Sequence, residues 1–161
     1  MKQYIGVKLI NATPMTRAEY NAFRGWQVPA DENGADDGFL VEYLDGGKAN
    51  TEQYKGYVSW SPAEVFKNAY GPTDGMTFGL AIEAAKRGHK ITRTNWNGKG
   101  MFVYYVTADM YPVKMPAAKS HFGDNSLVPY RAYLAMKTVD NDVVPWVASQ
   151  TDILANDWNI V

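Results

Sequence analysis

The chain has 161 residues, a net charge of -1 and no cysteine, and 46% of its residues are hydrophobic. This length suits one ordinary domain or two small ones, and the lack of cysteine excludes a disulfide framework, a thiolate nucleophile and a cysteine metal site. The near-neutral charge gives no global electrostatic argument for binding a nucleic-acid polymer. The N-terminus has no apolar run typical of a signal peptide, and no stretch approaches the length of a membrane span, so we expect a soluble, cytoplasmic protein.

The first part of the chain, residues 1–72, predicts one small unit. Residues 4–10 are expected to form a strand with imperfect alternation. Thr16 and Glu19 have the spacing of a capping box at the start of a helix, and Gly25 is expected to end that helix.

Two further strands and a second helix complete this unit. Residues 38–43 and 57–60 have the composition of strands, separated by a turn. In the following segment Ser61 is expected to cap a helix, with Pro62 at its first position and Glu64 at its third.

Residues 70–75 contain two glycines and a proline and are the candidate linker to a second unit, residues 76–161. A helix is predicted directly after this linker and is expected to end at Gly88. Its apolar residues recur at the spacing of one helix face: Phe78, Ala81, Ile82 and Ala85.

Short strands follow this helix. Residues 90–93 and 101–106 are expected to pair across the glycine-rich turn Asn97-Gly98-Lys99-Gly100. Residues 130–137 and 143–147 predict another hairpin, around Asp140-Asn141.

The segment from residue 107 to residue 129 contains three prolines and one glycine and is expected to be a long loop, a kind of segment that is often functional. The predicted fold class is therefore α+β. It comprises two small units, and the second is a helix packed on an antiparallel sheet with a long loop.

The residues offer little for catalysis. There are only two histidines, and neither His89 nor His121 has the partners of a catalytic triad or the spacing of a zinc site. The acidic pairs Asp36/Asp37 and Asp140/Asp142 fall in predicted turns, where solvation is the ordinary state. We therefore predict that the protein is not an enzyme and has no catalytic residues, metal ligands or cofactor.

The C-terminal run, residues 144–158, combines aromatic, amide and carboxylate side chains. Ser149 and Asp152 have capping-box spacing, which predicts a short helix whose first N–H groups point toward Trp146. An aromatic ring beside a helix N-terminus suits a ligand with a planar base and phosphate groups. The alternative is a buried tryptophan beside an ordinary helix cap.

The segment from Ala84 to Ala108 has five cationic side chains and no acidic one. A local basic segment in a near-neutral protein suggests a small anionic ligand, and the alternative is a solvated basic face. Within this segment Trp96 lies between Arg93 and Lys99. It is either a stacking surface for a ligand or a core anchor.

Two motifs in the second unit resemble those of the phage Thoeris anti-defence proteins of the second type. These are R-x-x-W-N-G-K-G, beginning at Arg93, and V-P-W-x-x-S-Q-x-D-x-x-A-x-D-W, beginning at Val144. The resemblance covers residues 76–161. It implies a nucleotide sponge, which binds and sequesters a cyclic nucleotide immune signal without cleaving it.

The resemblance further implies that the ligand is a cyclic ADP-ribose isomer, with cyclic dinucleotides as a further class. It also implies a homotetramer with pockets between protomers, acting in the host cytoplasm. Trp96 and Trp146 match motif tryptophans expected to stack on bases. Matching polar positions are Asn97, Ser149, Gln150 and Asp152, and charge alone adds Arg93 to the expected ligand-binding set.

Residues 1–72 depart from this minimal pattern. The segments W-S-P-x-E-V-F and G-W-x-x-P-x-D-E-N resemble an additional N-terminal phage domain of unknown function. Such a domain would block a pocket, add a second binding face or contact a host protein. Two other functions stay open for the whole chain: a phage structural or host-interaction protein, and a nucleotide-cleaving enzyme.

Overall fold

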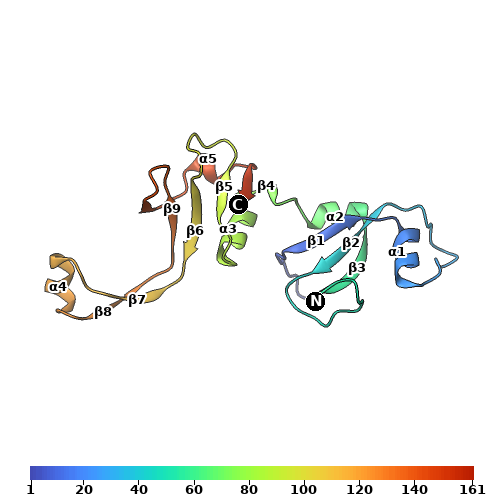
Figure 1. The fold of residues 1–161 in the computed structure, drawn as a ribbon, viewed down its shortest axis with the longest axis horizontal. Coiled ribbons are helices and arrows are strands. Elements are labelled where there is room, and N and C mark those ends of the chain that lie inside the picture. Colours follow the sequence, from blue (N-terminus) through green and yellow to red (C-terminus); the bar gives the residue numbers. More distant parts are fainter. The chain divides into compact units, whose positions relative to one another are not determined.

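The computed structural model describes all residues, 1–161, and confirms the α+β class with short helices and antiparallel sheets. Contacts divide the chain into two compact units, which are called unit 1 (Met1–Gly71) and unit 2 (Pro72–Val161). Figure 1 shows both units and labels most of their helices and strands.

Unit 1 is a three-stranded antiparallel sheet with two short helices, and its strand order is β1-β2-β3. The elements are β1 (Ile10–Pro14), α1 (Arg17–Arg24), β2 (Gly38–Tyr43), β3 (Tyr57–Pro62) and α2 (Ala63–Ala69).

The predicted start and end of the first helix are confirmed. The Thr16 backbone N–H donates to Glu19 Oε2 (2.7 Å), and the Glu19 N–H donates back to Thr16 Oγ1 (3.3 Å). Gly25 ends α1 with φ 70°, a left-handed conformation that glycine adopts without strain. Tyr20 of α1 is buried against the sheet in the core of unit 1, with Leu40 and Val58.

Two boundaries predicted for unit 1 are wrong. The strand expected at residues 4–10 begins only at Ile10, because its partner β2 ends at Tyr43, directly opposite Ile10. The second helix begins after Pro62, whereas Pro62 was expected to be its first residue. Ser61 pairs with Phe39 and so remains in the sheet, and no side chain caps α2.

Unit 2 contains a six-stranded antiparallel sheet with the order β10-β9-β6-β5-β11-β4. Its strands are β4 (Asp74–Met76), β5 (Ile91–Arg93), β6 (Phe102–Val106), β9 (Tyr133–Lys137), β10 (Val143–Pro145) and β11 (Trp158–Ile160). The last strand in chain order therefore lies inside the sheet, between β5 and β4. The predicted hairpin of β9 and β10 is confirmed, and Asn141 in its turn has φ 67°.

The helix α3 (Phe78–Lys86) packs on this sheet, as its apolar spacing predicted. Ala81 and Ala85 are fully buried against the sheet residues Ile91, Val103 and Trp158, each with no exposed surface or almost none. Small alanines let the helix approach the sheet closely.

The long loop predicted at residues 107–129 is wrong, because this segment forms β7 (Asp109–Pro112), α4 (Pro116–Phe122) and β8 (Leu127–Tyr130). These three elements are called the arm. β7 and β8 pair with each other, and Pro116 occupies the start of α4, where a proline favours a helix. Figure 1 shows the arm extending from the ends of β6 and β9.

The arm leaves large apolar side chains uncovered. Between 49% and 66% of the residue surface is exposed for Met110, Met115, Phe122, Leu127 and Tyr130. No helix of the chain is both long enough and apolar enough to cross a membrane.

Candidate functional site

The two motifs, which are about fifty residues apart in sequence, meet in unit 2 through the sheet. Arg93 ends β5 and lies directly opposite Trp158 of β11. The turn carrying Trp96 follows β5, and the helix α5 (Gln150–Ile153) shortly precedes β11. Pairing of β5 with β11 therefore brings the side chains of both motifs together in unit 2.

An aromatic cluster forms at this point. Trp158 has no exposed surface and contacts both motif tryptophans edge to face, with ring centroids 5.3 Å from Trp96 and 6.1 Å from Trp146. Trp96 and Trp146 also contact each other at 5.9 Å, and Phe78 of α3 packs against Trp158 and Trp146. Trp158 is therefore a core anchor, whereas Trp96 and Trp146 are only partly buried.

Asp152 links this cluster to α5. Its Oδ1 accepts hydrogen bonds from Arg93 Nη1 (2.8 Å) and Trp96 Nε1 (3.1 Å). Its Oδ2 accepts from the Ser149 hydroxyl (2.6 Å) and the Ser149 backbone N–H (3.1 Å). The Asp152 backbone carbonyl accepts from Trp158 Nε1 (3.0 Å). Asp152 therefore connects Arg93 and Trp96, at the end of β5 and in the turn after it, with Trp158 of β11.

Arg93 bonds to a second carboxylate as well. Its Nε donates to Asp157 Oδ1 (2.7 Å), and Asp157 Oδ2 accepts from the Asn95 backbone N–H (3.1 Å). The guanidinium, with 15% of its side chain exposed, therefore lies between two acidic groups. Its positive charge is largely balanced within the protein.

The charges of this network stabilise one another. Burial disfavours ionisation of Asp152, but hydrogen bonds from Ser149, Arg93 and Trp96 outweigh it and lower its pKa to about 2. Hydrogen bonding from Arg93 lowers the pKa of Asp157, and the two carboxylates raise the pKa of Arg93. All three groups are ionised at neutral pH.

The predicted capping box at the C-terminal helix is confirmed. The Asp152 N–H donates to Ser149 Oγ (3.2 Å), reciprocating the bonds from Ser149 to the Asp152 carboxylate. Since α5 has only four residues, its N-terminus adds little for binding phosphate.

The seven residues predicted to bind ligand fall into three groups. Arg93, Trp96, Ser149 and Asp152 form one hydrogen-bonded network, and Trp146 joins it through ring contact with Trp96. Asn97 and Gln150 are exposed, adjacent in sequence to Trp96 and Ser149, and their side chains make no hydrogen bonds within the chain. Their donors and acceptors are free for a ligand.

The basic segment between Ala84 and Ala108 is less free than its sequence indicates. Lys86 and Arg87 form ion pairs with Glu83, and the Lys90 ammonium lies 5.1 Å from the centre of the Phe102 ring. With Arg93 paired to two aspartates, most of these cations have partners elsewhere in the unit.

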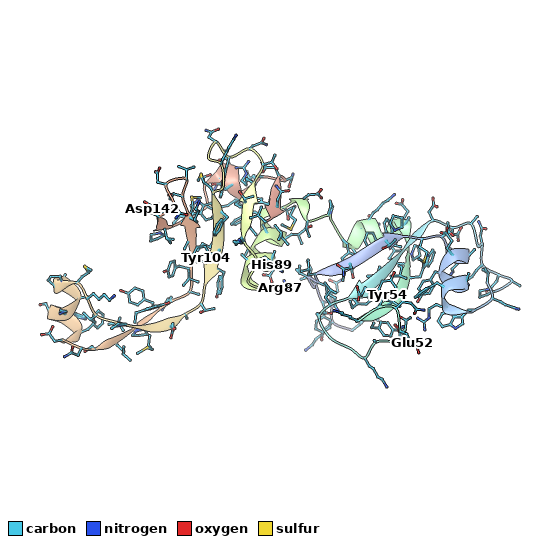
Figure 2. All side chains as sticks on the ribbon, viewed as in Figure 1. Glu52, Tyr54, Arg87, His89, Tyr104 and Asp142 are labelled. Atoms are coloured by element: carbon cyan, nitrogen blue, oxygen red, sulfur yellow. The ribbon has the colours of Figure 1, made fainter.

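The two histidines lie in different parts of unit 2. His89 lies beyond Arg87 at the end of α3 (Figure 2), whereas His121 is in α4 of the arm. Asp142, also labelled in Figure 2, accepts a hydrogen bond from Thr138 within its own hairpin turn. No three His, Asp or Glu side chains are grouped closely enough to hold a metal ion.

Three contributors to the site were absent from the predicted ligand-binding set. Asp157 holds Arg93 and the turn before Trp96, Phe78 supports the tryptophans from α3, and Trp158 packs against both motif tryptophans. An acidic residue directly before a buried strand tryptophan was the available signal for Asp157. Nothing local distinguishes Phe78 from an ordinary core residue.

Comparison with known proteins identifies the part of the chain that carries this site. The family model described as the Thoeris anti-defense 2-like domain matches residues 76–161. A protein of Bacillus phage SP01, named Thoeris anti-defense 2, is 38% identical over 89 residues, which cover 53% of this chain and 94% of that protein. Both matches fall on the site-bearing unit, and the family match leaves residues 1–75 outside it.

Proposed function

The chain belongs to the Thoeris anti-defense 2-like family, and from this premise we propose that it is a phage anti-defence protein that binds a cyclic nucleotide immune signal and sequesters it unchanged. The expected ligands are cyclic ADP-ribose isomers, with cyclic dinucleotides as the second class. Sequestration requires affinity and abundance but no reacting group. The absence of an assembled catalytic pair is compatible with this mechanism and does not by itself exclude an enzyme.

The observation that carries the proposal is the pairing of Trp96 and Trp146. These two tryptophans are fifty positions apart in the chain, contact each other and remain partly exposed. Stacking on a base contributes about 1–3 kcal/mol for each aromatic ring. The unbonded amides of Asn97 and Gln150 would recognise base edges or ribose hydroxyls beside them, next to the bonded group of Arg93, Ser149 and Asp152.

Stacking alone is not sufficient. Holding a signal at submicromolar concentration requires roughly -10 to -12 kcal/mol of binding free energy. Hydrogen bonds to the phosphates and exclusion of water must supply the remainder. We propose that a homotetramer in the host cytoplasm supplies both, with each pocket shared between protomers.

The arm supports self-association. Its exposed apolar residues, among them Phe122 and Leu127, would be covered if the arm packs on another copy of the chain. The same feature favours a second candidate function, a protein that contacts a phage or host protein through the arm.

A retention experiment separates these functions. The full chain is incubated with cyclic ADP-ribose isomers and, separately, with cyclic dinucleotides, then washed and heat-denatured, and the released nucleotides are analysed. Release of intact nucleotide supports the sponge, and release of an altered nucleotide indicates an enzyme. A chain that takes up nothing indicates the protein-contact function.

The tryptophan variants provide the control for this experiment. Trp96→Ala and Trp146→Ala should retain less nucleotide than the unchanged protein when all are assayed as folded protein at equal concentration. Tyr57→Ala, at an exposed position of unit 1, is the matched aromatic control and should retain as much as the unchanged protein.

A further inference from the structure

We propose that Asp152 is a positioning residue for Trp96, holding the indole ring in its binding orientation without itself contacting the ligand. This inference rests on the proposed function, because it concerns how the same site is organised. It changes the role that the motif resemblance implies for Asp152, from a ligand contact to a support.

The carboxylate of Asp152 has no acceptor capacity left for a ligand. Its two oxygens accept four hydrogen bonds, from Arg93, Trp96 and twice from Ser149, and a carboxylate offers about four such sites. Only 8% of the residue is exposed. A negative group would also repel the phosphates of a nucleotide.

Trp96 needs such a support because it lies in a turn. It follows β5 by three residues, and its backbone N–H makes only a long hydrogen bond to the Arg93 carbonyl (3.3 Å). Edge-to-face contacts with Trp146 and Trp158 hold the ring laterally but leave its rotation less defined. The indole N–H has one hydrogen to donate, and donating it to Asp152 fixes the plane of the ring.

A fixed plane matters for affinity. A side chain that is already ordered loses less rotamer freedom when the ligand binds, so more of the stacking energy appears as affinity. Asp152 is itself held by α5 through the capping box and by Arg93 of β5. The orientation of Trp96 therefore depends on both α5 and β5.

The chain provides a matched control in Asp157. This residue also forms an ion pair with Arg93, at 2.7 Å, and is also partly buried. Its second oxygen accepts from the Asn95 backbone N–H and it makes no bond to an indole. Asp157→Ala therefore removes one carboxylate from Arg93, together with the bond to the Asn95 N–H, but keeps the acceptor of the Trp96 indole, whereas Asp152→Ala removes a carboxylate from Arg93 and that acceptor.

The experiment uses the full chain with nitrogen-15-labelled tryptophan. Trp96→Phe identifies the indole N–H signal of Trp96 by its disappearance, and hydrogen exchange of that signal is then compared in the ligand-free proteins. Asp152→Ala should accelerate its exchange about tenfold or more, while Asp157→Ala should leave it within about threefold of the unchanged protein. Unchanged exchange in Asp152→Ala overturns the proposal, whatever the protein binds.

Affinity for a cyclic ADP-ribose isomer, measured by calorimetric titration, is the second measurement. Asp152→Ala and Trp96→Phe should each weaken binding about tenfold or more, and the double variant should bind no more weakly than the single variant that has the lower affinity. Fully additive losses would show that Asp152 acts independently of Trp96 and would overturn the proposal. If the unchanged protein binds neither a cyclic ADP-ribose isomer nor a cyclic dinucleotide, the proposed function fails, and the exchange measurement still decides whether Asp152 anchors Trp96.

Discussion

Arg93 and Trp158 are direct partners across the β5–β11 ladder, so their side chains leave the same face of the sheet. Trp158 is fully buried and supports the aromatic cluster, whereas Arg93 carries a charge that is balanced by two aspartates. The sheet therefore places the apolar and ionic supports of the candidate site next to each other. Variants at the cluster can separate residues that bind from residues that hold the fold.

Replacing the partly exposed tryptophans should affect binding more than folding. Trp96→Ala and Trp146→Ala are each expected to weaken binding of a cyclic ADP-ribose isomer by about 1–3 kcal/mol, roughly ten- to a hundredfold, through loss of stacking. Ligand titration and thermal melting of the same variants provide the measurement.

Trp158→Ala is the contrasting variant. Because Trp158 is fully buried, its loss should lower the free energy of unfolding of unit 2 by about 3–5 kcal/mol. If Trp96→Ala instead lowers stability by this amount, with unchanged affinity in the folded fraction, Trp96 is a core anchor and has no stacking role.

The Asp152 network should make unit 2 sensitive to acid. The pKa of Asp152 is lowered from 3.8 to about 2, so its contribution to stability is present above about pH 4 and is lost as the pH falls to about 2. The expected loss is about 2 kcal/mol. Urea unfolding of unit 2 at several pH values tests this, and Asp152→Asn should show a correspondingly smaller loss over the same range.

The sequence predicted those features that depend on neighbouring residues. The capping boxes at Thr16 and at Ser149 each depend on two residues that are three positions apart, and both were predicted correctly. The arm was predicted as a loop because prolines commonly interrupt helices and strands. Pairing between Tyr111 and Val128, seventeen positions apart, overrides that suggestion.

The same distinction applies to the candidate site. The capping function of Asp152 was predictable from its spacing to Ser149. Its bonds to Arg93 and Trp96 span 59 and 56 positions and depend on the order of strands in the sheet, which no local pattern specifies. Sequence reasoning therefore placed Asp152 at the site but could not show that its carboxylate is already occupied.

The two units should unfold separately. A Cβ added at Gly38 would collide with the Trp60 ring and lie 2.6 Å from the Ser61 carbonyl, so Gly38→Ala should destabilise unit 1 by about 1–3 kcal/mol. Scanning calorimetry should show one transition moving to lower temperature and the other unchanged. Two transitions that shift together would indicate that the units fold as one.

A fragment containing unit 2 alone should fold, provided that it retains β4. Residues 72–161 include the pairing of Met76 with Trp158, whereas a fragment beginning at Met76 loses Asp74 and its pairing with Asn159. We expect residues 72–161 to melt cooperatively and the shorter fragment to melt at a lower temperature, as measured by circular dichroism. An unfolded longer fragment would contradict this expectation.

Polar substitutions on the arm should weaken self-association. Met115→Ser combined with Leu127→Ser removes two exposed apolar side chains without disturbing a buried one. Light scattering at micromolar concentration should show a smaller assembly than the tetramer expected for the unchanged protein. Val65→Ser, at an exposed position of unit 1, is the control and should leave the assembly unchanged.

The position of β11 has a consequence for synthesis on the ribosome. All strands of unit 1 are complete by residue 62, so that unit can fold while the rest of the chain is being made. Unit 2 cannot, because β4 and β5 are joined only through β11, and the buried Trp158 arrives last. Until β11 is present, the sheet surface on which α3 packs is incomplete. The site-bearing unit is therefore assembled after translation of its final strand, and a premature stop before Trp158 would leave a folded unit 1 attached to an unfolded partner.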